Sequence, residues 1–124
     1  MYDAGADIIY AAAAGGSGVG VFQSAAAKGT LAIGVDSDQY ESVGDPALQK
    51  VILTSMLKRV DVAVFESLEM FANDKEIPAN TVFDLKSDGV GYSTSGGQID
   101  DIVPQLDEYK QKIIDGKITV PTTP

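Results

Sequence analysis

The chain has 124 residues, of which 44% are hydrophobic and 22% charged, a balance typical of one globular domain rather than of a disordered segment. Its net charge of −9 argues against nucleic acid and anionic membrane surfaces as partners, because both need clustered Lys and Arg, and the nine cations here are spread along the chain. The absence of Cys and His removes thiol nucleophiles, the usual general base and the commonest metal ligand, so the composition argues against an enzyme.

The first residues lack the features of an export signal. Residues 1–7 contain neither a basic stretch nor an apolar run. No later stretch approaches the roughly 20 apolar residues of a membrane span. Neither export nor insertion is therefore expected of the chain as it is written.

The first half of the chain predicts two parallel strands joined by a helix in a right-handed crossover. Continuous apolar runs without alternation are typical of strands that are buried on both faces. The expected elements are a strand over 6–14, a glycine-rich turn over 15–20, a helix over 21–28 that ends at Gly29, and a second strand over 31–35.

The second half mixes strands with amphipathic helices. The expected elements are a polar connection over 39–49, a strand over 51–55, a helix over 59–72, short strands over 81–85 and 89–92, a helix over 100–115 that ends at Gly116, and an extended tail over 118–121. Pro104 falls early enough in the last helix for its first turn, and Asp100 and Asp101 suit the positive end of its dipole. Phe22 and Phe65 are both expected in the core.

The predicted sheet is small for an independent domain. The chain starts almost directly in a buried strand, and a parallel sheet of two or three strands cannot cover both faces. We therefore expect the latter part of a larger α/β fold. The segments expected are 1–55, with the crossover unit and a hinge strand, then a helix over 56–80 that crosses to another lobe, and 81–124, which completes the lobes.

A glycine-rich turn from a strand into a helix can cradle a ligand, because glycines let the backbone approach and the helix N-terminus presents N–H groups. The phosphate-loop pattern fails, since Val21 and Phe22 follow Gly20 where Lys and Ser or Thr are required. The dinucleotide pattern fits weakly: Gly16 and Gly18 match, but Val21 holds the third glycine position. Asp36 lies twenty residues beyond Gly16, where such folds bind ribose hydroxyls. Alternatively, Asp36 merely caps a turn and the glycines merely allow close helix packing.

Two other charged features lie near Asp36 in the sequence or in the expected fold. Asp36, Asp38 and Glu41 could suggest a metal, but the glycine and terminal glutamate of a calcium loop are missing. Lys58 follows an apolar strand near the expected crevice, although a lysine at a strand end is usually only solvated.

Four strings of the sequence occur in the order found in one protein family. They are Gly5-Ala6-Asp7-Ile8-Ile9-Tyr10, the glycine string 14–22, Ile33-Gly34-Val35-Asp36-Ser37-Asp38-Gln39, and the string 53–64 that contains Ser55-Met56-Leu57-Lys58. Together they resemble the basic membrane protein family of bacterial substrate-binding lipoproteins. From Thr81 onward the match is looser, through Asp88-Gly89-Val90-Gly91-Tyr92 and Gly116-Lys117-Ile118.

The resemblance implies a two-lobed type I periplasmic-binding-protein fold, of which this chain is the C-terminal portion. It implies a purine nucleoside-like ligand, held without catalysis and without a cofactor for an ABC permease, in a lipid-anchored protein outside the cytoplasm. Asp36 and Lys58 would contact the ribose hydroxyls, and Gly15 and Gly16 would let the backbone approach the ligand. The lipobox cysteine and the residues that read the base belong to a portion absent here.

Two other functions are compatible with parts of the sequence. One is a truncated nucleotide-dependent enzyme that binds ribose through Asp36, which the missing third glycine and the absence of His and Cys oppose. The other is a non-binding fragment whose open sheet edges pair or swap with a second copy to form a homodimer.

Overall fold

A computed structural model of the chain describes residues 1–13 and 15–121, so Ala14, the last residue of the first expected strand, lies outside the described residues. The predicted fold class is confirmed, since the structure is α/β with a sheet dominated by parallel pairing. The chain divides into two compact units: Met1–Lys58 with Tyr92–Asp101, and Arg59–Gly91 with Ile102–Pro124. We call them unit 1 and unit 2.

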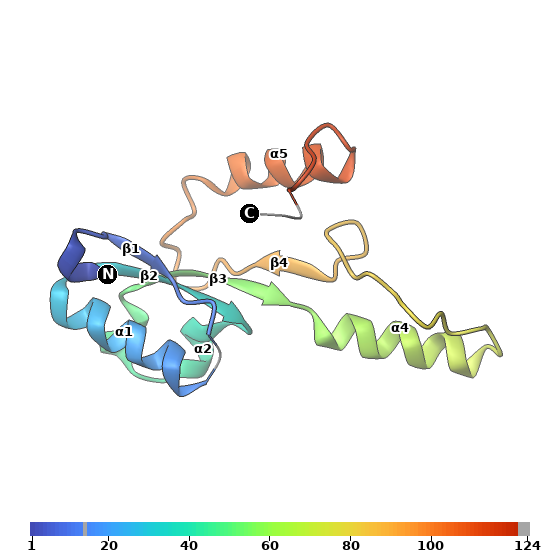
Figure 1. Cartoon of the computed structure of the whole chain (residues 1–124), viewed down its shortest axis with the longest axis horizontal. Helices are drawn as coiled ribbons and strands as arrows, with labels where there is room; N and C mark the ends of the chain where they lie inside the picture. Colours follow the sequence, from blue (N-terminus) through green and yellow to red (C-terminus); the bar gives the residue numbers. More distant parts are fainter. Residues whose placement is uncertain (14, 122–124) are drawn as a thin grey trace. The chain divides into compact units, whose positions relative to one another are not determined.

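Unit 1 contains most of the sheet, whose order is β1-β2-β3-β4 (Figure 1). Its strands run parallel from β1 to β2 and from β2 to β3, so the expected strand–helix–strand unit is confirmed. Its elements are η1 (Tyr2–Ala4), β1 (Ile8–Tyr10), α1 (Gly16–Lys28), β2 (Leu31–Asp36), α2 (Gln39–Val43), α3 (Pro46–Gln49) and β3 (Ile52–Lys58). The last strand, β4 (Val90–Tyr92), starts in unit 2. Tyr92, at the end of β4, belongs to unit 1.

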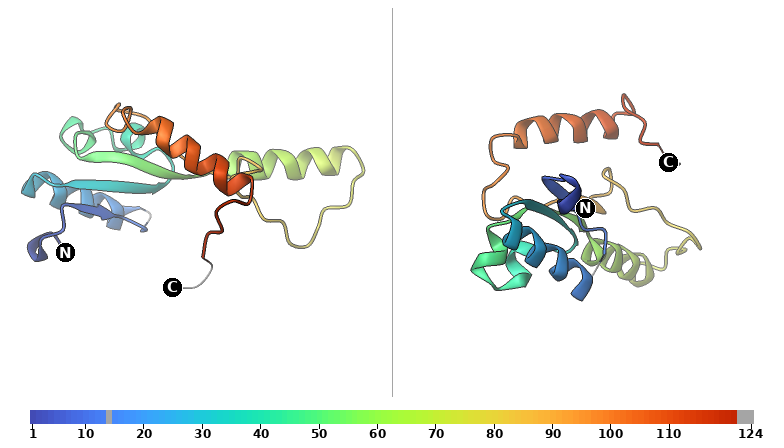
Figure 2. Two further views of the ribbon diagram at one scale, coloured as in Figure 1. Left: turned by 90° about the horizontal axis from the view of Figure 1, so that it is seen from above. Right: turned by 60° about the vertical axis from the view of Figure 1, so that its left-hand side comes forward.

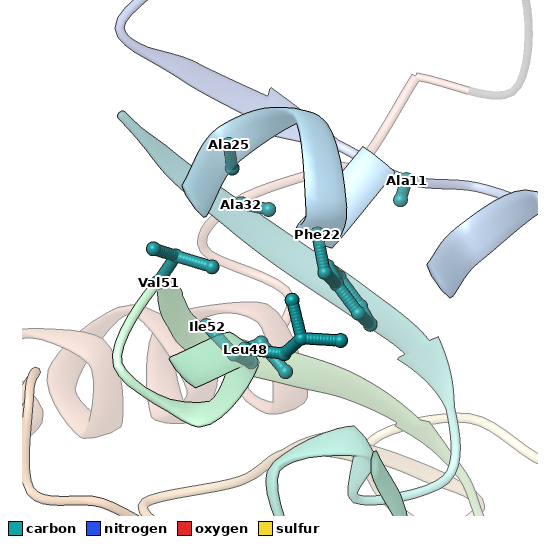
Figure 3. Packing of buried hydrophobic residues seen from close by; sticks show 7 residues of the cluster. All are labelled: Ala11, Phe22, Ala25, Ala32, Leu48, Val51 and Ile52. Atoms are coloured by element: carbon teal, nitrogen blue, oxygen red, sulfur yellow. The ribbon is translucent and has the colours of Figure 1, made fainter. Parts of the chain in front are cut away.

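The core of unit 1 lies between α1, α3 and the sheet (Figure 3). Phe22 of α1 and Ile52 of β3 are fully buried, and burying a side chain of this size contributes roughly 1.5–3 kcal/mol. The members of the cluster are Ala11, Phe22, Ala25, Ala32, Leu48, Val51 and Ile52. Phe22 was correctly predicted as a core residue.

The sheet of unit 1 is covered unequally on its two faces. In β1 only Ile9 is buried, whereas Ile8 and Tyr10 are 42% and 48% exposed. Their parallel partners on β2, Leu31 and Ile33, share that face and are only half-buried. The expectation that this apolar run is buried on both faces is therefore wrong for β1. Burial alternates along the strand because only one face is packed, although all three residues are apolar.

The glycine-rich stretch is mostly helical. Only Gly15 has a left-handed φ, of 67°, and α1 begins at Gly16, five residues before the predicted start. The expectation of a turn through Gly20 is therefore wrong. Glycine disfavours helix interiors by only about 1 kcal/mol, which packing of the helix against the sheet can offset. The end of the helix was predicted correctly, since Gly29 caps it with a φ of 64°.

The connection predicted as polar and irregular over 39–49 contains two short helices. Asp38 caps α2 and Asp45 caps α3, in both cases by accepting a hydrogen bond from a backbone amide two residues on. Pro46 then occupies the first turn of α3, where its missing N–H costs nothing. Strand β3 extends to Lys58, three residues beyond the predicted end.

Unit 2 contains two helices, α4 (Val60–Ala72) and α5 (Val103–Ile114), which Figure 2 shows from two further sides. The predicted helix over 59–72 is confirmed, with Arg59 as its N-cap. Helix α5 starts at Val103, so Asp100 and Asp101 precede it instead of opening it, while Pro104 lies in its first turn as predicted. Gly116, with a φ of 71°, follows its end.

Two expectations for unit 2 are wrong. Residues 81–85 form no strand, because the Asp84 carboxylate accepts hydrogen bonds from the amides of Lys86 and Ser87 and turns the chain there. Phe65 is not in a core but is 67% exposed on α4. The helical spacing of the apolar residues correctly predicted that a helix forms, but it did not predict that Phe65 is exposed.

Candidate functional site

Asp36 is the last residue of β2, and its side chain is exposed. Its φ of 71° is left-handed, a conformation that few non-glycine residues adopt and that Asp and Asn tolerate best. The strand therefore stops abruptly at Asp36. The carboxylate is presented at the carboxyl edge of the sheet, where open α/β sheets bind ligands.

Lys58 is the last residue of the neighbouring strand β3 and is also exposed. In the parallel register Asp36 is opposite Leu57, so Lys58 directly follows the partner of Asp36. Adjacent strands lie about 4.8 Å apart, and the two charged residues therefore lie at one edge of one sheet. None of the ion pairs in the described part of the chain joins Asp36 to Lys58.

The glycines after β1 differ in what requires them. Gly15 has the backbone conformation that a side chain would strain, and Gly16 opens α1, with empty space where a side chain would project at either position. Gly18 is buried instead, and a Cβ there would lie 2.7 Å from the carbonyl oxygen of Ala13. Close packing therefore accounts for Gly18, whereas there is free space around Gly15 and Gly16.

The segment that follows Asp36 is held by the carboxylate of Asp38. Its Oδ2 accepts hydrogen bonds from Ser93 Oγ and Ser95 Oγ, both at 2.6 Å, and its Oδ1 accepts from the amide of Tyr40 at 3.2 Å. Burial raises the pKa of the Asp38 carboxyl, but these hydrogen bonds together outweigh burial and hold the pKa below its ordinary value of 3.8. Asp38 is therefore a structural anion.

Gln39 and Ser55 form a second set of contacts at the same strand ends, and the sequence did not single them out. The side-chain oxygen Gln39 Oε1 accepts a hydrogen bond from the backbone amide of Val35 at 2.8 Å. The backbone amide of Gln39 donates to Ser55 Oγ at 3.1 Å. Ser55 is fully buried. A Cβ on Gly34 would lie 2.7 Å from both Gln39 Oε1 and Ser55 Oγ, so Gly34 provides the space that these two side chains occupy.

These structural residues differ in how readily the sequence alone could have identified them. Asp38 is the N-cap of α2, and an Asp directly before a helix is a known capping signal that sequence inspection can find. Ser93 and Ser95 are 55 and 57 residues from Asp38, and no local pattern connects them. Gln39 looked like an ordinary residue of a polar connection, because its partner Ser55 comes from another strand.

The described residues offer little else that could form a site. No group of three or more acidic side chains in the described chain is placed to hold a metal ion, and this includes Asp36, Asp38 and Glu41. A shallow cavity of about 300 Å³ lies between η1 and α1, with Tyr2, Ser17 and Val21 in its lining, and it includes neither Asp36 nor Lys58. Among the described residues, no helix has both the length and the hydropathy needed to traverse a bilayer.

Comparisons with known proteins give one consistent result. A family model described as "ABC transporter substrate-binding protein PnrA-like" matches residues 1–124. The chain is 40% identical to a CD4+ T-cell-stimulating antigen of Listeria monocytogenes, with 100% of this chain aligned to 38% of that protein. It is 35% identical to the ABC transporter nucleoside-binding protein BmpA of Lactococcus lactis, with 98% of this chain aligned to 38% of that protein.

The solved structures agree with the sequence relatives. An ABC transporter solute-binding protein from Aeropyrum pernix K1 superimposes with a TM-score of 0.69 and 27% identity, over 99% of this chain and 42% of that one. The chain thus spans about two fifths of the length of the proteins it matches, in keeping with the expected partial fold. The resemblance drawn from the four sequence strings is confirmed: the chain belongs to the Bmp family of PnrA-like ABC transporter substrate-binding proteins.

Proposed function

We propose that this chain contributes one part of a nucleoside site, in which Asp36 and Lys58 bind the ribose hydroxyls of a purine nucleoside-like ligand. The observation that carries the proposal is the pair of exposed, opposite charges at the ends of adjacent parallel strands. Two neighbouring hydroxyls can donate to one carboxylate while a lysine donates to their oxygens, and each such charge-assisted bond contributes roughly 1.5–3 kcal/mol. The similarity to the Lactococcus BmpA, a nucleoside-binding protein, supports this class of ligand.

Gly15 and Gly16 have a supporting role in this proposal. Both are exposed and follow β1, and a Cβ added at either position would meet no heavy atom within 4 Å. A left-handed glycine followed by the first turn of a helix lets a ligand approach the main chain closely.

We further propose that the whole protein delivers its ligand to an ABC permease, from a lipid anchor outside the cytoplasm, and performs no chemistry. The family assignment supports the transport role. The chain changes unit after Lys58, after Gly91 and after Asp101, which supports a path that crosses three times between two lobes. The part of the site that reads the base would come from the portion that the relatives have and this chain does not match.

Calorimetric titration of the chain with inosine, guanosine and adenosine tests the ligand class. Asp36→Asn keeps a residue that tolerates the left-handed backbone but removes the charge, and we expect a loss of affinity of roughly 10–100-fold. Asp74→Asn is the matched control, since Asp74 also has a left-handed φ, of 53°, but lies far along the sequence in unit 2. An Asp36→Asn chain that binds as tightly as the native chain would refute the assigned role.

A second candidate function, assembly with another copy, has its own support. β1 is an edge strand of the sheet, and the apolar side of α4 is exposed through Val60, Val64, Phe65, Leu68 and Phe71. Uncovered strand edges and contiguous apolar surface both favour pairing or exchange between chains. Sedimentation velocity over a wide concentration range decides this, and a compact monomer at the highest concentration would exclude the homodimer.

A further inference from the structure

We infer that Gln39 positions Asp36 for ligand binding without touching the ligand. Strand β1 ends before strand β2, and Gln39 supplies the hydrogen-bond partner that a longer β1 would provide. The inference rests on the proposed role of Asp36 at the ribose, and concerns a residue that contacts Val35 on the strand ending in Asp36 and Ser55 on the next strand. We call Gln39, with its two partners Val35 N and Ser55 Oγ, the Gln39 brace.

The edge of β2 that faces β1 continues past the end of β1. The amide of Ala11 donates to Ile33 O at 2.8 Å, so the polar backbone groups of Ile33 point toward β1. Those of Val35, two residues on, point the same way in an extended strand. β1 ends at Tyr10, opposite Ile33, so the Val35 amide has passed the end of its neighbour. Gln39 Oε1 accepts from that amide at 2.8 Å and continues the ladder with a side chain.

The side-chain amide group of Gln39 is surrounded by two elements of unit 1. A Cβ on Gly34 of β2 would lie 2.7 Å from Gln39 Oε1, and a Cβ on Gly18 of α1 would lie 3.6 Å from Gln39 Nε2. The side chain therefore lies between the strand that ends in Asp36 and the first turns of the helix that begins at Gly16. It spans the two backbone segments that the proposed function brings to one ligand.

The left-handed backbone of Asp36 needs support from both sides. A left-handed non-glycine residue is strained and persists only where its surroundings determine its conformation. The residue before Asp36 is held by Gln39 Oε1. The segment after it is held by the backbone amide of Gln39, which donates to Ser55 Oγ, together with the Asp38 carboxylate. Gln39 thus takes part in the hold on both sides of Asp36, and it provides the only one of these contacts made to the residue before Asp36. Without that contact the strand end can relax toward an ordinary extended conformation.

The test compares a ligand that Asp36 can recognise with one that it cannot. Gln39→Met keeps the length of the side chain but removes the acceptor for Val35, and we expect it to weaken inosine binding about 10-fold. Affinity for 2′,3′-dideoxyinosine, which offers Asp36 no ribose hydroxyl pair, should remain unchanged. Gln23→Met, on the exposed surface of α1, is the matched control. Equal loss for both nucleosides would mean that Gln39 supports the fold in general, and would overturn the inference, as would no loss for either.

A second variant and a second measurement keep the inference testable without binding data. Ser55→Ala removes the acceptor for the Gln39 amide and should give the same ribose-selective loss, even where Gln39→Met folds poorly. Hydrogen exchange followed by NMR should be faster at Val35 through Gln39 in both variants, and unchanged at Phe22 in the core. In a chain that binds no ribonucleoside, faster exchange at these amides supports the brace and refutes only the ribose role of Asp36. Unchanged exchange overturns the brace itself.

Discussion

Unit 1 and unit 2 use apolar residues of the same kinds but bury them to different extents. Helix α1 buries Phe22 completely against the sheet, whereas neither α4 nor α5 contains a buried residue. Phe22 and Phe65 illustrate the difference, since both lie on helices with apolar positions at helical spacing, yet one is fully buried and the other is 67% exposed. Periodicity therefore predicts that a helix forms, and only the partner surface determines whether its apolar side becomes a core.

The two units also differ in how their polar groups are held. In unit 1 the side chains of Asp38, Gln39 and Ser55 bond groups on other elements. In unit 2 the polar contacts include exposed ion pairs such as Arg59 with Asp61 and Asp88, and side-chain bonds to the nearby backbone. Exposed ion pairs contribute little to stability, so unit 1 should be the more stable part of the chain.

The largest expected effect tests this difference directly. Phe22→Ala leaves a cavity in the only cluster of buried residues found in the described chain, and should lower the free energy of unfolding by about 3–5 kcal/mol. Phe65→Ala, the matched change on α4, should alter it by less than about 0.5 kcal/mol, because that ring is already exposed to solvent. Urea titration followed by circular dichroism measures both. A large loss for Phe65→Ala would mean that α4 is covered in solution.

The second effect compares two glycines of unit 1. Gly34→Ala places a methyl group 2.7 Å from Gln39 Oε1 and Ser55 Oγ, so it should displace the brace and cost about 1–3 kcal/mol. Gly20→Ala, inside α1 with open space around it, should stabilise the chain by about 0.5–1 kcal/mol through its higher helix propensity. Thermal melts of the two variants should move in opposite directions. A Gly34→Ala chain as stable as the native one would show that the space around Gly34 is not needed.

The smallest effect is a pH dependence carried by Asp38. Because its pKa in the folded chain lies below the ordinary value of 3.8, the folded state binds the proton less tightly than the unfolded state does. The stabilisation is therefore present above pH 3.8 and is lost as the pH falls through the lower, folded value. Asp38→Asn should be less stable than the native chain at pH 6 and lose less stability on acidification.

The control for this prediction is Asp7→Asn, an exposed aspartate before β1. Melting temperatures measured between pH 6 and pH 3 should give parallel curves for the native chain and for this control. A parallel curve for Asp38→Asn as well would contradict the assignment of acid sensitivity to the contacts with Ser93 and Ser95.

Particular residues correctly predicted much of the fold. Gly29, Pro104 and Gly116 correctly marked helix ends, and the apolar strings 31–35 and 51–55 correctly located two parallel strands. The start of α1 was misplaced because glycine weakens a helix without forbidding it. The strand expected over 81–85 failed because the Asp84 side chain bonds the backbone locally, in competition with a sheet.

The sequence by itself determined the α/β class, the family and the positions of Asp36 and Lys58 at strand ends, because these depend on local patterns and on strings that neighbouring residues form. Only the tertiary structure decided that Asp36 is left-handed, that Gly18 and Gly34 make room for other groups, and that Gln39 spans β2 and α1. Gln39 and Gly34 both meet Ser55 Oγ of β3, and Gly18 meets the carbonyl oxygen of Ala13, so these roles depend on how neighbouring elements pack. The same reason explains Phe65, whose exposure is set by what packs on α4 and not by its own residue type.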